Sequence, residues 1–447
     1  MLFKQQLPGD EAGGGLSGRG SAPIEEGIAL RLRIHERLLD LLNLSVLEKT
    51  PRESLRVEIR TVVGQLLQQE KRLLTPSQTE QLTEDVLDEL LGLGPLEPLL
   101  KDPTINDILI NTHNSVYVER LGKLEKTDVH FQDTRHLIRI INKIVAAVGR
   151  RVDESQPMVD ARLADGSRVN AVIPPLAVDG PLVSIRKFAA VPIHMGRLIE
   201  LNSATAEIAQ LLQAIVKCRR NVLISGGTGS GKTTLLNALS AFIEHRERIV
   251  TIEDSAELQL QQPHVCRLET RPENIEGRGE VNQRDLVKNA LRMRPDRIIL
   301  GEVRGGEAFD MLQAMNTGHD GSMTTVHANT PRDALSRIEQ MIGMVGLDIS
   351  PRSIRQQIAS AINVVVQTER LEDGRRRIVS VSEITGMEQD VISMQEIFRF
   401  RRRGIEKDGT IRGDFEATGI RPQVMELVAA RGLEVPGLSF APAKRTP

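Results

Sequence analysis

Residues 221–234 read NVLISGGTGSGKTT, and this stretch decides the fold. It opens as a short apolar run typical of a buried strand, and residues 226–233 fit the pattern G-x-x-x-x-G-K-[S/T] in full. Glycines suit such a loop because backbone N–H groups must turn inward and approach phosphate oxygens closely. The alternative is a glycine turn with only a structural role. A strand, a glycine loop and a helix in this order predict a phosphate-binding loop in a parallel sheet.

The residues of this loop have separate expected tasks. Lys232 would reach the β- and γ-phosphates, and Thr233 would give its hydroxyl to Mg²⁺. The helix that begins near Thr234 would point its N-terminus at the anion. The residues expected to bind the nucleotide are Gly226, Gly227, Thr228, Gly229, Ser230, Gly231, Lys232, Thr233 and Thr234.

Two more apolar runs end in carboxylates. The run RIVTI precedes Glu253, and the run RIIL precedes Gly301 and Glu302, although such a strand usually ends in an aspartate. In a parallel sheet both carboxylates would lie at the edge that carries the phosphate loop. One can orient magnesium while the other polarises the attacking water as general base. The alternative for either residue is a solvated acid at a strand end.

Residues 316–329 form a small, polar, glycine-rich stretch that holds His319 and His327. A zinc site is a poor interpretation because no third nitrogen or sulfur ligand follows at a plausible spacing. A histidine at the sheet edge could instead sense the γ-phosphate, and the alternative is a histidine satisfied within the structure.

Composition limits the function classes. The chain has 447 residues, a formal net charge of -2 and 2% aromatic residues, which disfavours binding of single-stranded nucleic acid. Every apolar stretch is interrupted before it could span a bilayer. The two cysteines, Cys218 and Cys266, pair with no nearby metal-type ligand and suggest no disulfide framework.

The pattern along the chain predicts an α/β protein of several parts. Apolar residues at helical spacing give way to short alternating strands, and then to strands that alternate with glycine loops and helices. Two arginine-rich spots, residues 375–377 and 401–403, are either solvated surface or a partner contact. The expected parts are a disordered leader (1–22), a helical N-terminal region (23–100), an α+β N-terminal domain (101–190), a linker (191–203), an α/β nucleotide-binding domain (204–390) and a C-terminal region (391–447).

Four blocks stand in order: GGTGSGKTT, TIEDSAELQL, RMRPDRIILGEVRG and NTGHDGSMTTVHANTP. Together they resemble the secretion ATPases of the type II/type IV superfamily. The segments DPTINDILINTHNSVYVERLGKLEKTDVHF and RLETRPENIEGRGEV look like the tight-adherence (Flp-type) pilus ATPase branch. The resemblance covers the chain from about Leu90 to its tail. The four-cysteine zinc module of part of the superfamily does not occur in the sequence, so we expect no structural zinc.

The resemblance implies a RecA-like P-loop ATPase domain that uses ATP and Mg²⁺. Glu253 then leads as the residue that positions the water, and Glu302 supports the metal and hydrolysis, although the choice of general base between them stays open. His327 takes a place near the γ-phosphate, and His319 is a weaker candidate. Further cationic donors by resemblance are Arg162 and Arg168 of the N-terminal domain and Arg267 and Arg271 of the ATPase domain.

The same resemblance implies a homohexameric motor for Flp-type pilus assembly and secretion. It would work in the cytoplasm and reach the inner membrane through platform proteins, and pilin only indirectly. Two alternatives are kept: a DNA-transfer secretion motor, which the near-neutral charge disfavours, and a nucleotide-gated assembly scaffold, which the intact carboxylates disfavour.

Overall fold

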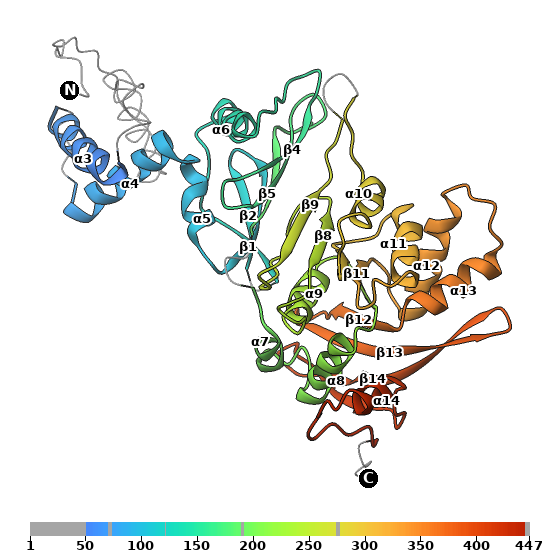
Figure 1. Ribbon diagram of the computed structural model, residues 1–447. Coiled ribbons are helices and arrows are strands. Elements are labelled where there is room, and N and C mark those ends of the chain that lie inside the picture. Colours follow the sequence, from blue (N-terminus) through green and yellow to red (C-terminus); the bar gives the residue numbers. More distant parts are fainter. Residues whose placement is uncertain (1–50, 70–73, 121, 189–191, 274–277, 443–447) are drawn as a thin grey trace. The chain divides into compact units, whose positions relative to one another are not determined.

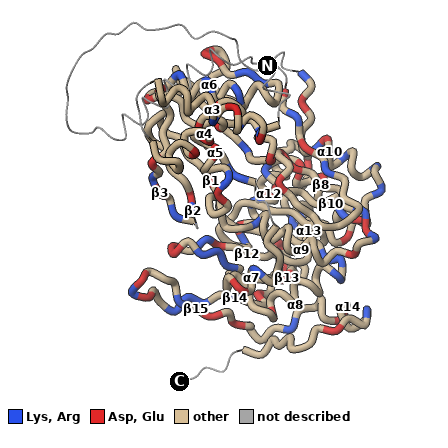
Figure 2. Tube along the Cα trace, turned by 90° about the vertical axis from the view of Figure 1, so that its left-hand side faces the viewer, with Lys and Arg blue, Asp and Glu red and all other residues tan. Residues whose placement is uncertain are grey.

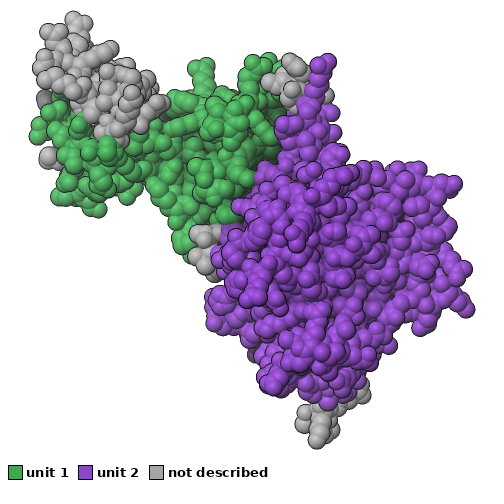
Figure 3. Space-filling view, viewed as in Figure 1, with its two compact units in different colours: residues 1–190 green, residues 191–447 purple. Residues whose placement is uncertain are grey.

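The computed structural model describes residues 51–69, 74–120, 122–188, 192–273 and 278–442 (Figure 1). The expected leader and residues 23–50 of the expected helical region lie outside these residues. The chain divides into two compact units, residues 1–190 and 191–447 (Figure 3). Among the described residues, no helix has both the length and the apolar character that crossing a bilayer requires.

The first unit opens with a helical hairpin. It comprises α3 (Arg52–Gln69) and α4 (Pro76–Leu91), followed by η1 (Gly94–Leu96) and α5 (Glu97–Lys101). Helix α4 starts at Pro76, where the Thr75 hydroxyl accepts the Gln78 N–H in a capping box and proline suits the first turn. The two long helices bury a shared cluster that includes Leu55, Ile59 and Leu87.

A six-stranded antiparallel sheet completes the first unit. Its strands run in the order β3-β2-β1-β6-β5-β4. Their bounds are β1 (Ile105–Thr112), β2 (Ser115–Arg120), β3 (Lys123–Lys126), β4 (Met158–Arg162), β5 (Arg168–Val172) and β6 (Leu182–Arg186). Helix α6 (Thr134–Ala147) buries its apolar side chains in one cluster with those of this sheet.

The second unit is built on a nine-stranded sheet in the order β15-β14-β13-β12-β7-β11-β10-β8-β9. Strands β12 to β9 of this order are parallel, and β13, β14 and β15 extend the sheet in antiparallel fashion. The strands are β7 (Val222–Gly226), β8 (Ile249–Glu253), β9 (Val265–Glu269), β10 (Arg297–Leu300), β11 (Met323–Val326), β12 (Val364–Arg370), β13 (Arg376–Glu388), β14 (Val391–Ile405) and β15 (Ile411–Ala417).

Helices cover both faces of this sheet, and each face of the sheet contributes to its own hydrophobic core. Val222 and Ile224 of β7 belong to one core and Leu223 to the other, as expected for a strand that is buried on both faces. The helices are α7 (Met195–Glu200), α8 (Ala206–Lys217), α9 (Lys232–Ser240), α10 (Gln283–Ala290), α11 (Glu307–Asn316), α12 (Pro331–Gly343), α13 (Pro351–Ala361) and α14 (Val424–Ala430). This is the α/β, RecA-like arrangement expected from the sequence.

The residues after 390, expected as a separate C-terminal region, contribute to the same sheet. Strand β14 begins at Val391 and pairs with β13 from Val391 to Arg399. Basic and acidic residues follow one another along the β14 and β15 side of the molecule (Figure 2). Within the second arginine-rich spot, Arg402 pairs with Glu369 at 2.6 Å and Arg403 pairs with Asp414 at 2.9 Å. These arginines therefore take part in a network of ion pairs on the sheet.

Candidate functional site: one edge of the parallel sheet

The phosphate loop joins β7 to α9, and its backbone geometry explains its glycines. Gly229 and Gly231 have φ angles of +69° and +96°, which side chains on L-residues rarely permit. Gly226 is needed for a different reason: a Cβ there would lie 2.5 Å from the Thr368 carbonyl oxygen of the neighbouring strand β12. The loop is thus shaped both by its own backbone and by the strand beside it.

Lys232 is buried at the start of α9. Its Nζ donates to the carbonyl oxygens of Gly226, at 3.0 Å, and Gly227, at 2.9 Å. The same Nζ lies 3.3 Å from His327 Nε2 and 3.4 Å from Nδ1. The ammonium group therefore lies inside the loop and in contact with the end of β11.

His327 links Lys232 to Glu302. Burial, and then the positive charge of Lys232, lower the pKa of His327, so the imidazole is neutral at neutral pH. Its Nε2 lies 3.1 Å from Glu302 Oε1. We assign the proton to Nε2, which donates to Glu302, and this leaves Nδ1 to accept from Lys232. Lys232, in the helix that follows β7, is thereby connected to residues that follow β11 and β10, the next two strands of the sheet.

Arg304 follows Glu302 and was not among the residues we predicted. Its Nη2 lies 3.0 Å from Glu302 Oε2, and its Nη1 lies 3.5 Å from Asp254 Oδ2. The hydrogen bond to Glu302 raises the pKa of Arg304 further, so its charge is permanent. The signal that could have identified it is its position two residues after a strand-end carboxylate.

Glu253 ends β8, next to β10, in a different setting. The residue is only 4% exposed, and its Oε2 accepts the N–H groups of Glu257 at 2.7 Å and Leu258 at 2.9 Å. Among the described residues, Oε1 has no hydrogen-bond partner. Burial raises the pKa of Glu253 to about 7, against the lowering effect of the two backbone N–H groups.

Gly301 makes room for Glu253. A Cβ built at position 301 would lie 2.9 Å from Glu253 Cγ, a distance that real Cβ contacts do not show. Position 301 pairs into the sheet through its N–H, which donates to the Ile252 carbonyl at 2.9 Å. An aspartate at the end of β10 would therefore collide with the glutamate that ends β8. This explains the Gly-Glu order in the sequence.

Three other predicted residues of the second unit, Arg267, Arg271 and His319, make their hydrogen bonds outside this cluster of contacts. Arg267 Nη2 donates to the Ala256 carbonyl at 3.3 Å, and its charge acts on Glu253. Arg271 Nε donates to the Gly279 carbonyl at 2.7 Å and so closes its own loop. His319 Nδ1 lies 3.2 Å from the Ala314 carbonyl at the end of α11.

Two predicted residues, Arg162 and Arg168, belong to the first unit. They lie opposite each other in the β4–β5 register and both are partly buried.

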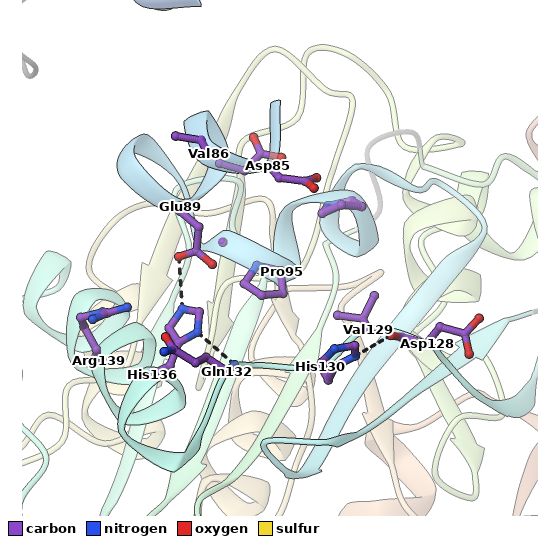
Figure 4. A pocket seen from close by; sticks show the side chains of 13 residues that line it. Asp85, Val86, Glu89, Pro95, Asp128, Val129, His130, Gln132, His136 and Arg139 are labelled. Atoms are coloured by element: carbon purple, nitrogen blue, oxygen red, sulfur yellow. Dashed lines mark hydrogen bonds and ion pairs between the residues drawn. The ribbon is translucent and has the colours of Figure 1, made fainter. Parts of the chain in front are cut away.

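A cavity of about 230 Å³ lies within the first unit, between α4, the segment before α6, and α6 itself (Figure 4). His136 Nδ1 accepts the Gln132 N–H, so Nε2 carries the proton and donates to Glu89 at 3.1 Å. None of the predicted site residues lines this cavity.

Comparison with known proteins gives a consistent picture. The family model for "Type II/IV secretion system protein" matches residues 89–409. A putative conjugal transfer protein of Mycobacterium tuberculosis is 37% identical over 335 residues, which cover 70% of this chain and 95% of that protein. The type IV secretion system protein VirB11 of Bartonella quintana is 33% identical over 338 residues, which cover 67% of this chain and 93% of that protein.

A solved structure, that of the VirB11 ATPase from the Brucella suis type IV secretion system, is 30% identical in sequence. The match covers 65% of this chain and 92% of the VirB11 chain, with a TM-score of 0.35.

Proposed function

Because this chain belongs to the type II/IV secretion system protein family, we propose that it is an ATPase whose hydrolysis of ATP drives secretion or pilus assembly. The observation that carries the proposal is the connected set of Lys232 at the start of α9, His327 after β11 and Glu302 after β10. It joins a phosphate-binding cation to a carboxylate through a neutral imidazole. Such a set can respond to the γ-phosphate and to its loss.

Lys232 would bind the β- and γ-phosphates by exchanging partners. Its Nζ donors now serve the Gly226 and Gly227 carbonyls, and phosphate oxygens are stronger acceptors for an ammonium group. Nucleotide binding thus removes one set of hydrogen bonds from Lys232 and supplies another. His327, in contact with the same Nζ, would register this change.

The oxygen donors at the site fit magnesium. Thr233 supplies a hydroxyl in the first turn of α9, and Glu302 supplies a carboxylate whose oxygens face His327 and Arg304. Magnesium prefers hard oxygen ligands and takes one or two of them from protein, with phosphate oxygens beside them. When bound, it would neutralise charge on the phosphates.

Glu253 is the residue we assign as general base. A base works best when its pKa lies near the working pH, and burial raises the pKa of Glu253 to about 7. Its Oε2 is held by two backbone N–H groups, which leaves Oε1 to accept a proton from water. Glu302, held between a guanidinium and an imidazole, is better suited to anchoring the metal.

The test is hydrolysis by the purified full chain. We expect magnesium-dependent release of phosphate from ATP that Lys232→Ala abolishes, while Lys288→Ala, at an exposed lysine of α10, leaves it unchanged. Hydrolysis that persists in the Lys232→Ala variant would contradict the proposal.

For the cargo, we propose Flp-type pilus assembly, on the sequence segments quoted above. Conjugal DNA transfer is a second candidate because relatives that match most of the chain bear that name. Complementing a gene deletion with wild type and with Lys232→Ala separates the two, with surface pili and DNA transfer scored separately. Loss of pili alone supports the first, and loss of DNA transfer alone supports the second. Normal pili with Glu302→Gln would instead favour a nucleotide-gated scaffold.

We further propose a homohexamer in the cytoplasm that reaches the inner membrane through platform proteins. Arg162 and Arg168 remain proposed donors to the transferred phosphoryl group, on the resemblance alone. If active sites are completed in an assembly, hydrolysis per subunit falls when the protein is diluted below its assembly concentration.

A further inference from the structure

The hairpin formed by β12 and β13 supports the phosphate loop from the side of β12. Thr368 pairs with Gly226 in the sheet, and its hydroxyl donates to the Ser225 carbonyl at 3.2 Å. A hydroxyl has one proton, so the Thr368 oxygen accepts from the Ser230 hydroxyl 2.9 Å away. Both side chains are buried. The loop is therefore fastened to β12 at Ser230.

Arg376, at the start of β13, contacts the phosphate loop at Gly229, the residue before Ser230. Its Nε donates to the Gly229 carbonyl at 2.7 Å. A loop that turns its N–H groups toward a phosphate turns carbonyl oxygens outward, and these need donors of their own. The Gly229 carbonyl shares a peptide group with the Ser230 N–H. That N–H donates to the Gly227 carbonyl at 3.3 Å, and a guanidinium on the Gly229 oxygen polarises it as a donor. An anion in the loop would compete with the Gly227 carbonyl for this donor.

Arg370, at the end of β12, adds a second positive charge near the loop. A Cβ built at Gly229 would lie 3.5 Å from Arg370 Nη1, and one built at Gly231 would lie 3.5 Å from Arg376 Cδ. Both arginines thus lie against the backbone that is expected to carry the phosphates. Their charge favours an anion in the loop.

The hairpin tip is itself held by the C-terminal strands. Leu371 packs with Phe400 of β14 and Ile411 of β15. The Asp373 carboxylate accepts the Ile411 N–H at 2.9 Å, and Arg402 pairs with Glu369 at 2.6 Å. The support of the phosphate loop therefore extends to residues after 390.

We propose that Thr368 and Arg376 are positioning residues for the phosphate loop, and that they set its affinity for nucleoside di- and triphosphates. The inference rests on the proposed function, because it presumes that the loop binds a nucleotide. Neither residue reacts with the nucleotide. Each fixes the backbone that does the binding.

The experiment compares nucleotide binding by matched variants of the full chain, with a fluorescent ADP analogue and magnesium. We expect Arg376→Ala to weaken binding about tenfold, which is typical of a lost charge-assisted hydrogen bond, and Arg376→Lys to restore part of the affinity. Arg375→Ala, which removes the exposed neighbouring arginine, should leave the affinity unchanged. Thr368→Val should weaken binding, and Thr368→Ser should restore it.

Steady-state kinetics give a second readout: Arg376→Ala should raise KM for ATP more than it lowers kcat. Wild-type affinity in Arg376→Ala, with binding lost in Lys232→Ala, would overturn this inference and leave the proposed ATPase intact. Absence of binding by wild type would overturn both. A loss that Arg376→Lys and Thr368→Ser do not reduce at all, together with lower melting temperatures, would show a merely structural role.

Discussion

The ends of β8 and β10 differ although the two strands are neighbours and each is followed by a glutamate. The Glu253 side chain is buried, and its Oε2 accepts two backbone N–H groups. Burial raises the pKa of its carboxyl to about 7. The Glu302 side chain is 21% exposed and lies between Arg304 and His327. Burial that outweighs the charge of Arg267 favours a proton acceptor at Glu253, and the fixed charge of Arg304 favours an anchored anion at Glu302. One sheet edge thus holds two carboxylates suited to different tasks.

The largest expected effect comes from Glu253→Gln. The amide keeps the side-chain volume and removes the proton acceptor, so kcat should fall on the order of a thousandfold while ATP binding persists. Single-turnover hydrolysis and nucleotide titration of the same preparation would measure both. A smaller loss here than in Glu302→Gln would reverse the two assignments.

Glu302→Gln should have the next largest effect. We expect kcat to fall on the order of a hundredfold, because the metal loses a charged ligand. The magnesium concentration needed for half the maximal rate should rise as well, which Glu253→Gln should not cause. An unchanged magnesium requirement in a titration of the rate would count against the metal role.

Gly301→Ala tests the contact between the two strand ends. The added methyl group would lie 2.9 Å from Glu253 Cγ, so Glu253 must move, and kcat should fall about tenfold with little change in KM. Gly343→Ala is the control, since a Cβ at that position meets no atom within 4 Å. Equal rates for the two variants would mean that the exact place of Glu253 does not matter.

The smallest effect concerns stability and pH. Glu253 binds its proton more tightly when folded, so its contribution to the free energy of unfolding is greatest at low pH. That contribution is lost as the pH rises from 4.5, the ordinary pKa of a glutamate, through the folded-state pKa of about 7. The full loss is about 3 kcal/mol by linkage. The side-chain amide of the Glu253→Gln variant cannot ionise. The melting temperature of the variant minus that of wild type should therefore increase by a few degrees from pH 5 to pH 8. If this difference in melting temperature stays constant with pH, the pKa of Glu253 is not raised by folding.

Local patterns were sufficient to predict the parallel sheet and the common edge of Glu253 and Glu302. Each of these two residues follows an apolar run, and parallel strands align such ends. His327 stands in a small, polar stretch, and its place near the γ-phosphate is what the resemblance implies. The link from Lys232 through His327 to Glu302 could be expected only in outline, since it depends on side-chain distances.

The roles of Gly301, Thr368 and Arg376 could not be predicted from neighbouring residues. Arg376 meets the phosphate loop from 147 positions away, and Thr368 meets Ser230 from 138. Such contacts depend on which strand lies next to β7, and periodicity alone does not specify strand order. The part expected at 391–447 joins the same sheet for a related reason, because the sequence pattern does not show that β14 pairs with β13.

The continuity of the nine-stranded sheet also determines how the chain can be shortened. Strand β15 presents an outer border that carries Arg412, Asp414 and Glu416, and charged borders resist joining other chains. A protein cut at residue 390 would instead end its sheet at β13, which would lose the partner strand β14 from Ser380 to Glu388. The unpaired backbone groups of such an edge can pair with another chain, and β13 also carries apolar side chains such as Val381 and Ile384. The last strands therefore also cover a sheet edge at which copies of a shortened chain would associate.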